Sequence, residues 1–218
     1  MFADRAEAGR LLAARLIDLK LENPIVFALP RGGVPIGAEL ARSLAAPLDV
    51  IFARKIGAPD QPELAVGAVA GVGEAPEIVL HAELVQSLAL TEEYILQSAA
   101  RELAVIERQQ SQYAAVRPTA NPKHRTAIVV DDGVATGMTM QAALRYVRRQ
   151  EPARLIAATP VAARDAAAML RKEADDTVLL SVPRRFASVG GFYRVFAQVT
   201  DAEVVALLQA CNAWPRSG

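Results

Sequence analysis

The hydrophobic positions along the chain form short apolar runs that alternate with segments of helical periodicity. The runs are rich in β-branched residues, which is typical of strands buried on both faces of a parallel sheet. Five strands are predicted, over residues 25–29, 48–53, 127–130, 155–158 and 177–180. Apolar residues spaced three and four apart predict helices over residues 34–44, 139–149 and 163–173. We therefore expect an α/β fold with a doubly wound, mostly parallel sheet flanked by helices.

One segment, residues 57–123, breaks this alternation. Its apolar stretches 64–70 and 78–80 are punctuated by glycine and predict a hairpin. A long helix follows, with Thr91 as its N-cap, and runs to about Tyr113. We interpret the segment as an insertion within a single domain that covers residues 1–218.

The last helix is predicted by a capping box, in which Thr200 is followed three residues later by Glu203. Between this box and the strand at 177–180 lies an irregular stretch, residues 181–199, that is rich in proline, arginine and glycine. Its composition predicts loop rather than regular structure.

Composition narrows the class of protein. With 52% hydrophobic and 22% charged residues, the chain can bury a sizeable core. The 24 Lys and Arg balance 24 Asp and Glu, so any anion site must be local and a nucleic-acid partner is not expected. A lone cysteine, Cys211, excludes an internal disulfide framework. No apolar run reaches the roughly 18 residues of a membrane span, and we expect a cytoplasmic protein.

The most informative stretch follows the strand at 127–130, where Asp131 and Asp132 precede a glycine-bounded loop that opens a helix. Ligands of open parallel sheets bind beyond the carboxyl ends of the strands, so both acids can accept hydrogen bonds from vicinal hydroxyls there. The loop offers amides and hydroxyls at a helix N-terminus, which binds anions. Its residues are Gly133, Val134, Ala135, Thr136, Gly137, Met138 and Thr139. A diol site beside an anion site is typical of a ribose 5-phosphate; the alternative is a solvated Asp–Asp turn.

Two further pieces precede this stretch. The first is Pro30-Arg31-Gly32-Gly33, between the strand at 25–29 and the following helix, where glycines permit close backbone approach. The second is the basic pair Arg54-Lys55, predicted at the end of the strand at 48–53. Each has a plainer alternative, an ordinary strand-to-helix turn for the first and a solvent-facing basic pair for the second.

Taken in chain order, the stretch 30–33, the basic pair 54–55, the insertion, the stretch 131–139 and the irregular segment 181–199 resemble the type I phosphoribosyltransferases over about residues 25–199. The stretch 131–139 is similar to that family's motif for 5-phosphoribosyl 1-diphosphate (PRPP). The resemblance implies that Pro30, Arg31, Gly32 and Gly33 form a diphosphate loop, which in such proteins often holds a non-proline cis peptide. It also implies that Arg54 and Lys55 supply positive charge to the leaving diphosphate, and that residues 181–199 form a hood over the acceptor.

The resemblance implies an enzyme that transfers the phosphoribosyl group of PRPP to a nitrogen of a small acceptor, expected to be heterocyclic, and releases diphosphate. Mg²⁺ is the implied cofactor, with Asp131 and Asp132 acting through PRPP hydroxyls or water. A loop between residues 57 and 73 would close as a lid. Gly133 and Ala135 depart from the family pattern, and Ala135 stands where 6-oxopurine enzymes carry an acid, which argues against hypoxanthine or guanine.

Two questions stay open at this level. The hood aromatics Phe186, Phe192 and Tyr193 would stack on an acceptor ring, or they would pack a small cap. The chain would be an enzyme, or a regulator that binds PRPP as a sensor without turnover. In the regulator, the long helix 91–113 would serve a partner or a homodimer.

Overall fold

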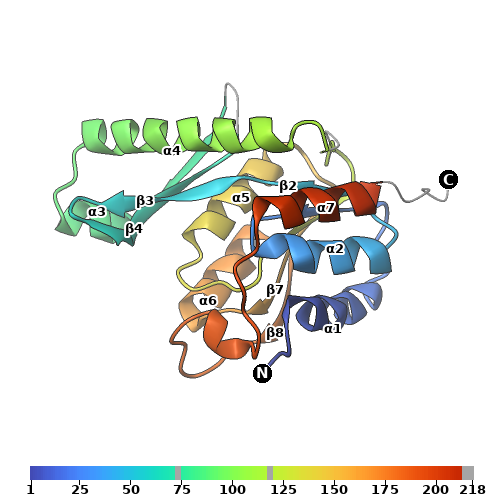
Figure 1. Cartoon of the computed structure of the whole chain (residues 1–218). Coiled ribbons are helices and arrows are strands. Elements are labelled where there is room, and N and C mark those ends of the chain that lie inside the picture. The colour runs from blue at the N-terminus through green and yellow to red at the C-terminus, as the bar shows by residue number, and fades with distance from the viewer. Residues whose placement is uncertain (72–74, 117–119, 213–218) are drawn as a thin grey trace.

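A computed structural model describes residues 1–71, 75–116 and 120–212. Its centre is a five-stranded parallel sheet in the order β2-β1-β6-β7-β8. The strands are β1 (Pro24–Ala28), β2 (Leu48–Val50), β6 (Thr126–Val130), β7 (Arg154–Val161) and β8 (Asp176–Ser181). Helices cover both faces of this sheet (Figure 1). The prediction of a doubly wound α/β fold is confirmed.

The two faces of the sheet bury different helices because successive side chains of a strand point to opposite sides. Val26 and Ile128 face α1 (Arg5–Ile17), α2 (Gly33–Ser43) and α7 (Asp201–Asn212). Phe27 and Val129 face α5 (Met138–Arg148) and α6 (Arg164–Glu173). The central strands are therefore buried on both faces, as predicted. The exception is β8, which was expected to be buried and is half-exposed along its length; it lies at one edge of the sheet, whereas β2 at the other edge is buried.

A second, antiparallel sheet contains β3 (Ala53–Ala58), β4 (Gln61–Ala70) and β5 (Glu77–Leu80) in that order. The predicted hairpin is present as β4 and β5, followed by α3 (Ala82–Ser87) and by α4 (Glu92–Tyr113), which lies along the top of Figure 1. Small side chains of β4 pack on Met138 and Ala142 of α5. This packing holds the second sheet beside the N-terminal end of α5.

Two sequence predictions about the region around β3 are wrong: the extent of the strand at 48–53 and the loop character of the lid. The apolar run 48–53 was interpreted as one strand, but β2 ends at Val50 and Arg54 and Lys55 lie inside β3. A continuous apolar run carries no mark of the point where the chain leaves one sheet for another, so the break was hidden. Residues 57–70, expected to be part of a lid loop, are mostly a hairpin of β3 and β4.

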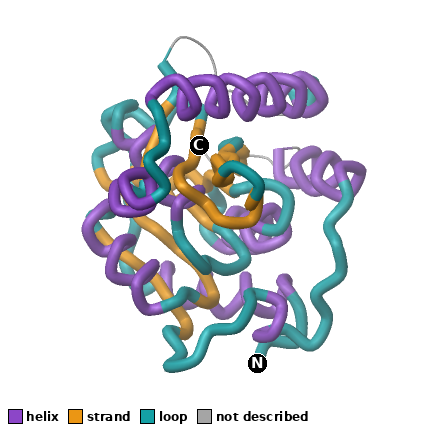
Figure 2. The backbone as a smooth tube through the Cα atoms, turned by 90° about the vertical axis from the view of Figure 1, so that its left-hand side faces the viewer, coloured by secondary structure: helices purple, strands orange, loops and turns teal. Residues whose placement is uncertain are grey.

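The hood segment, residues 181–199, contains one short 3₁₀ turn, η1 (Gly190–Phe192). It is joined to the N-terminus by backbone hydrogen bonds: Phe2 N donates to Phe192 O (2.8 Å), Arg194 N to Phe2 O (2.8 Å) and Val195 N to Ala3 O (2.9 Å). Figure 2 shows the segment as mainly loop that passes beside the N-terminus. Among the described residues, the helices all lack the combination of length and apolar character that a membrane crossing requires.

Candidate active site

The two predicted phosphate loops follow the neighbouring strands β1 and β6, between which the strand order of the parallel sheet reverses. Strands β1 and β6 are paired in parallel, with Ala28 opposite Val130. From β1 the chain continues to β2 on one side, and from β6 it continues to β7 on the other. The crevice beyond their carboxyl ends is thus the topological switch point, the usual ligand site of open α/β sheets.

The two loops touch at Gly32. A Cβ atom at this position would lie 2.1 Å from Oδ2 of Asp132, so only glycine permits the carboxylate to rest there. The peptide bond between Pro30 and Arg31, just before this contact, is cis. The structure therefore brings the loop 30–33 directly against the acidic pair.

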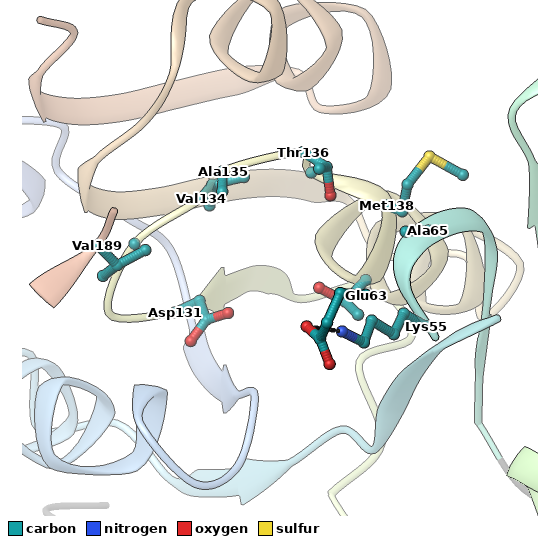
Figure 3. A pocket seen from close by; sticks show the side chains of 12 residues that line it. Lys55, Glu63, Ala65, Asp131, Val134, Ala135, Thr136, Met138 and Val189 are labelled. Atoms are coloured by element: carbon teal, nitrogen blue, oxygen red, sulfur yellow. Dashed lines mark hydrogen bonds and ion pairs between the residues drawn. The ribbon is translucent and has the colours of Figure 1, made fainter. Parts of the chain in front are cut away.

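A cavity of about 290 Å³ lies beside the loop that follows β6 (Figure 3). Gly137 has a φ of +85° and caps α5, whose first turn carries no acidic side chain. The unsatisfied amides of that turn favour an anion. The lining residues are Lys55, Glu63, Ala65, Asp131, Gly133, Val134, Ala135, Thr136, Gly137, Met138, Thr139 and Val189. Every residue of the predicted loop 133–139 thus lines one cavity, with the hood contributing Val189.

The two acids have different surroundings. Asp131 lines the cavity, and burial followed by the charge of Asp132 raises the pKa of its carboxyl well above the ordinary value. Burial also raises the pKa of Asp132, an effect that its hydrogen bond from Arg5 opposes. The Arg5 Nε–H donates to Asp132 Oδ2 at 2.8 Å. Tyr193 donates its hydroxyl proton to the backbone carbonyl of Asp132 at 2.6 Å.

The three predicted cations lie in different places. Lys55 lines the cavity and pairs with Glu63 across the hairpin at 2.6 Å. Arg54 points to the opposite side of β3, as strand alternation requires, and forms an ion pair with Glu102 of α4. Arg31 lies 3.6 Å from Asp201, the first residue of α7. Lys55 is therefore brought to the cavity, and the other two are placed outside its described lining.

The hood aromatics pack against other rings. Tyr193 is buried, with its ring centroid 5.4 Å from that of Phe2 and 5.1 Å from that of Phe196. Phe186 and Phe192 form a partly exposed pair at 5.4 Å. The described lining of the cavity includes Val189 of the hood and does not include Phe186, Phe192 or Tyr193.

Sequence reasoning missed Arg5 as a residue of this site. Its guanidinium touches Asp132, and its Nη1 donates to the carbonyl of Ala197 at 2.7 Å. Contacts over 127 and 192 positions have no local signature in the sequence.

Comparison with known proteins places the chain among phosphoribosyl transferases. Residues 3–193 match the family model described as "Phosphoribosyl transferase domain". The chain is 40% identical over 212 residues to "Putative phosphoribosyl transferase Rv0571c" and to "Putative phosphoribosyl transferase MT0597", from two strains of Mycobacterium tuberculosis. The alignments cover 97% of this chain and 47% of each relative, so the chain spans about half the length of these relatives.

A solved structure is similar over nearly the whole chain. The protein TT1426 from Thermus thermophilus is 45% identical, and the alignment covers 96% of this chain and 98% of that one. The TM-score is 0.81. The parallel sheet, the added antiparallel strands and the flanking helices are thus an arrangement that the two proteins share.

Proposed function

The chain belongs to the phosphoribosyl transferase family, and from this membership we propose that it transfers the 5-phosphoribosyl group of PRPP to a nitrogen of a small heterocyclic acceptor, releasing diphosphate. The observation that carries the proposal is the cavity at the switch point. There Asp131 and the whole loop 133–139 surround the N-terminus of α5, and the loop 30–33 lies against Asp132.

Each part of PRPP has a chemical counterpart at this site. The 5-phosphate would accept hydrogen bonds from amides at the start of α5 and from the hydroxyls of Thr136 and Thr139. The ribose diol would donate to the carboxyls of Asp131 and Asp132. The diphosphate would extend toward the glycine loop 30–33 and toward Lys55, whose charge lies on the cavity wall.

The reaction breaks the bond between C1 and the diphosphate oxygen and forms a bond between C1 and the acceptor nitrogen. Positive charge grows on the ribose while negative charge grows on the diphosphate. Lys55, Arg31 and the loop amides stabilise the negative charge. The β3–β4 hairpin forms the wall that carries Lys55 and Glu63, and closure of this wall would exclude water from the reactive C1.

A divalent magnesium ion fits the donor set of this site. Mg²⁺ prefers oxygen ligands and keeps several waters, and it is commonly bound by one or two carboxylates together with substrate phosphates. Asp131 and Asp132 would supply such carboxylates, acting through PRPP hydroxyls or water. The described residues contain no cluster of three or more acidic, histidine or cysteine side chains that could hold a metal unaided. When bound, the ion would neutralise charge on the departing diphosphate.

Ala135 bears on the acceptor. It lines the cavity at the position where the resemblance to 6-oxopurine enzymes would require an acid. A methyl group cannot take a proton from an acceptor nitrogen. We infer that the acceptor is not hypoxanthine or guanine.

Calorimetric titration with PRPP, with and without Mg²⁺, tests the proposal. The wild type should bind in a magnesium-dependent manner, and Asp132→Asn should weaken binding by at least about 10-fold because a charged acceptor is lost. Asp165→Asn, an exposed acid on α6, is the matched control. Failure of the wild type to bind PRPP would refute the proposal. Binding without diphosphate release over a broad set of heterocyclic acceptors would favour a PRPP sensor instead of a transferase.

A further inference from the structure

Arg5 forms three contacts at once beside the proposed PRPP site. Its Nε lies 2.8 Å from Asp132 Oδ2, its Nη1 lies 2.7 Å from the Ala197 carbonyl, and its guanidinium carbon lies 3.9 Å from the centre of the Phe196 ring. The Arg5 side chain is only 12% exposed and that of Asp132 only 13%. Such a fork of donors over an aromatic face holds a guanidinium in one orientation.

The position of Arg5 within its own helix is unfavourable. It is the first residue of α1, at the positive end of the helix dipole, where acidic side chains are favoured. Asp4 and Glu7 already fulfil the local requirements, since Asp4 caps the helix by accepting from Glu7 N. The Arg5 charge therefore does not stabilise α1. Its unfavourable position at the helix N-terminus is offset by the ion pair with Asp132, 127 positions away.

The contact fixes the carboxylate that the ribose diol would meet. Oδ2 of Asp132 rests over Gly32 and accepts from Arg5, while Tyr193 holds the backbone carbonyl of the same residue. Arg5 is itself tied to the hood through Ala197 and Phe196. The N-terminal segment thus acts on the Asp132 carboxylate through Arg5, and the hood acts on Asp132 both through its contacts with Arg5 and through Tyr193.

We propose that Arg5 is a positioning residue of the PRPP site, holding the Asp132 carboxylate over Gly32 in the orientation that receives the ribose diol. This inference rests on the proposed function. It makes the N-terminal segment and hood residues 196–197 part of the binding apparatus, although neither lines the described cavity.

PRPP affinity in three variants tests the inference. Arg5→Met keeps the packing over Phe196 and removes the charge and the donors. We expect it to bind PRPP about 10- to 100-fold more weakly, by analogy with the effect of removing a residue that orients a metal-binding side chain. Arg5→Lys keeps the positive charge but lacks the several N–H donors of the guanidinium group, so its PRPP affinity should lie between those of Arg5→Met and the wild type. Arg15→Met, an exposed arginine of the same helix, should bind as the wild type does.

The outcomes separate this inference from the proposed function. If the wild type binds PRPP and a folded Arg5→Met binds equally or more tightly, Arg5 does not position Asp132 and the inference fails alone. If the wild type does not bind PRPP, the proposed function fails and takes the inference with it. If Arg5→Met does not fold, Arg5→Lys decides: reduced affinity in the folded variant supports positioning, and wild-type affinity overturns it.

Discussion

Substitution of Gly32 by alanine tests the contact between the two loops with a single methyl group. Gly32 has φ −62° and ψ −33°, an ordinary right-handed conformation, so alanine adds no backbone strain. Its Cβ would lie 2.1 Å from Asp132 Oδ2 and 2.6 Å from Asp132 Cγ. Any loss of folding stability in Gly32→Ala must therefore come from displacement of this carboxyl group.

The size of the effect follows from these distances. Ordinary contacts of a Cβ atom begin near 3.4 Å, so the carboxyl group must move by about 1 Å or more. The Arg5–Asp132 hydrogen bond of 2.8 Å would then exceed the range of hydrogen bonding, because Arg5 is held by Ala197 and Phe196. Breaking a buried ion pair costs about 3–5 kcal/mol, and we expect the lower end because both side chains retain some exposure.

Urea denaturation measures this loss directly. Gly32→Ala should lower the free energy of unfolding by about 3 kcal/mol with an unchanged denaturant slope, and it should weaken PRPP binding in parallel. Gly191→Ala in the hood is the control, since the nearest atom to its Cβ would be Ser188 Oγ at 3.6 Å. In an Asp132→Ala background the alanine at position 32 should cost nothing further. Wild-type stability together with wild-type PRPP affinity in Gly32→Ala would refute the placement of Asp132.

Two further predictions concern the cavity. Thr136→Val should weaken PRPP binding by about 10-fold, because one charge-assisted hydrogen bond is lost. The urea midpoint should not change, because Thr136 is exposed. Unaltered PRPP affinity in calorimetry would show that this hydroxyl does not bind the phosphate. Burial, and after it the charge of Asp132, raises the pKa of Asp131, so the native state holds the proton of this carboxyl more tightly than the unfolded state does. The contribution of Asp131 to folding stability therefore falls as the pH rises from its unfolded-state pKa through its folded-state pKa. Asp131→Asn should abolish that decline, so that its stability advantage in urea denaturation grows as the pH rises above the ordinary pKa of an aspartate, about 4. A difference independent of pH would contradict the pKa direction.

Local features of the fold were predictable because their causes are local. Thr91 caps α4 by accepting from Tyr94 N at 3.2 Å, and Thr200 and Glu203 form the predicted capping box at the start of α7. Both signals need only a short-range pairing of side chain and amide. The loop 133–139 was equally predictable, because its residue types and its position between a strand and a helix are both evident from one short stretch of consecutive residues.

Features set by tertiary contacts were not predictable. Helix α1 was missed although Leu12 and Leu16 are buried at helical spacing, since no strand precedes it to mark an alternation. Strand β8 resembles the central strands in composition but is half-exposed at one edge of the sheet, whereas β2 at the other edge is buried, so exposure depends on tertiary packing that the sequence pattern does not show. The separation of Arg54 from Lys55 depends on β3, whose start is hidden in an apolar run.

The hydrogen bonds between the N-terminus and the hood also bear on the order in which the protein is made. Synthesis proceeds from the N-terminus, and nascent chains fold as their parts emerge from the ribosome. Phe2, Ala3 and Arg5 are made well before their partners in residues 192–197. Gly32 and Asp132 are both available much earlier. A ribosome-bound chain can therefore assemble the parallel sheet with its crevice while Arg5 still lacks Phe196 and Ala197, and the site is completed only after these two residues have been made.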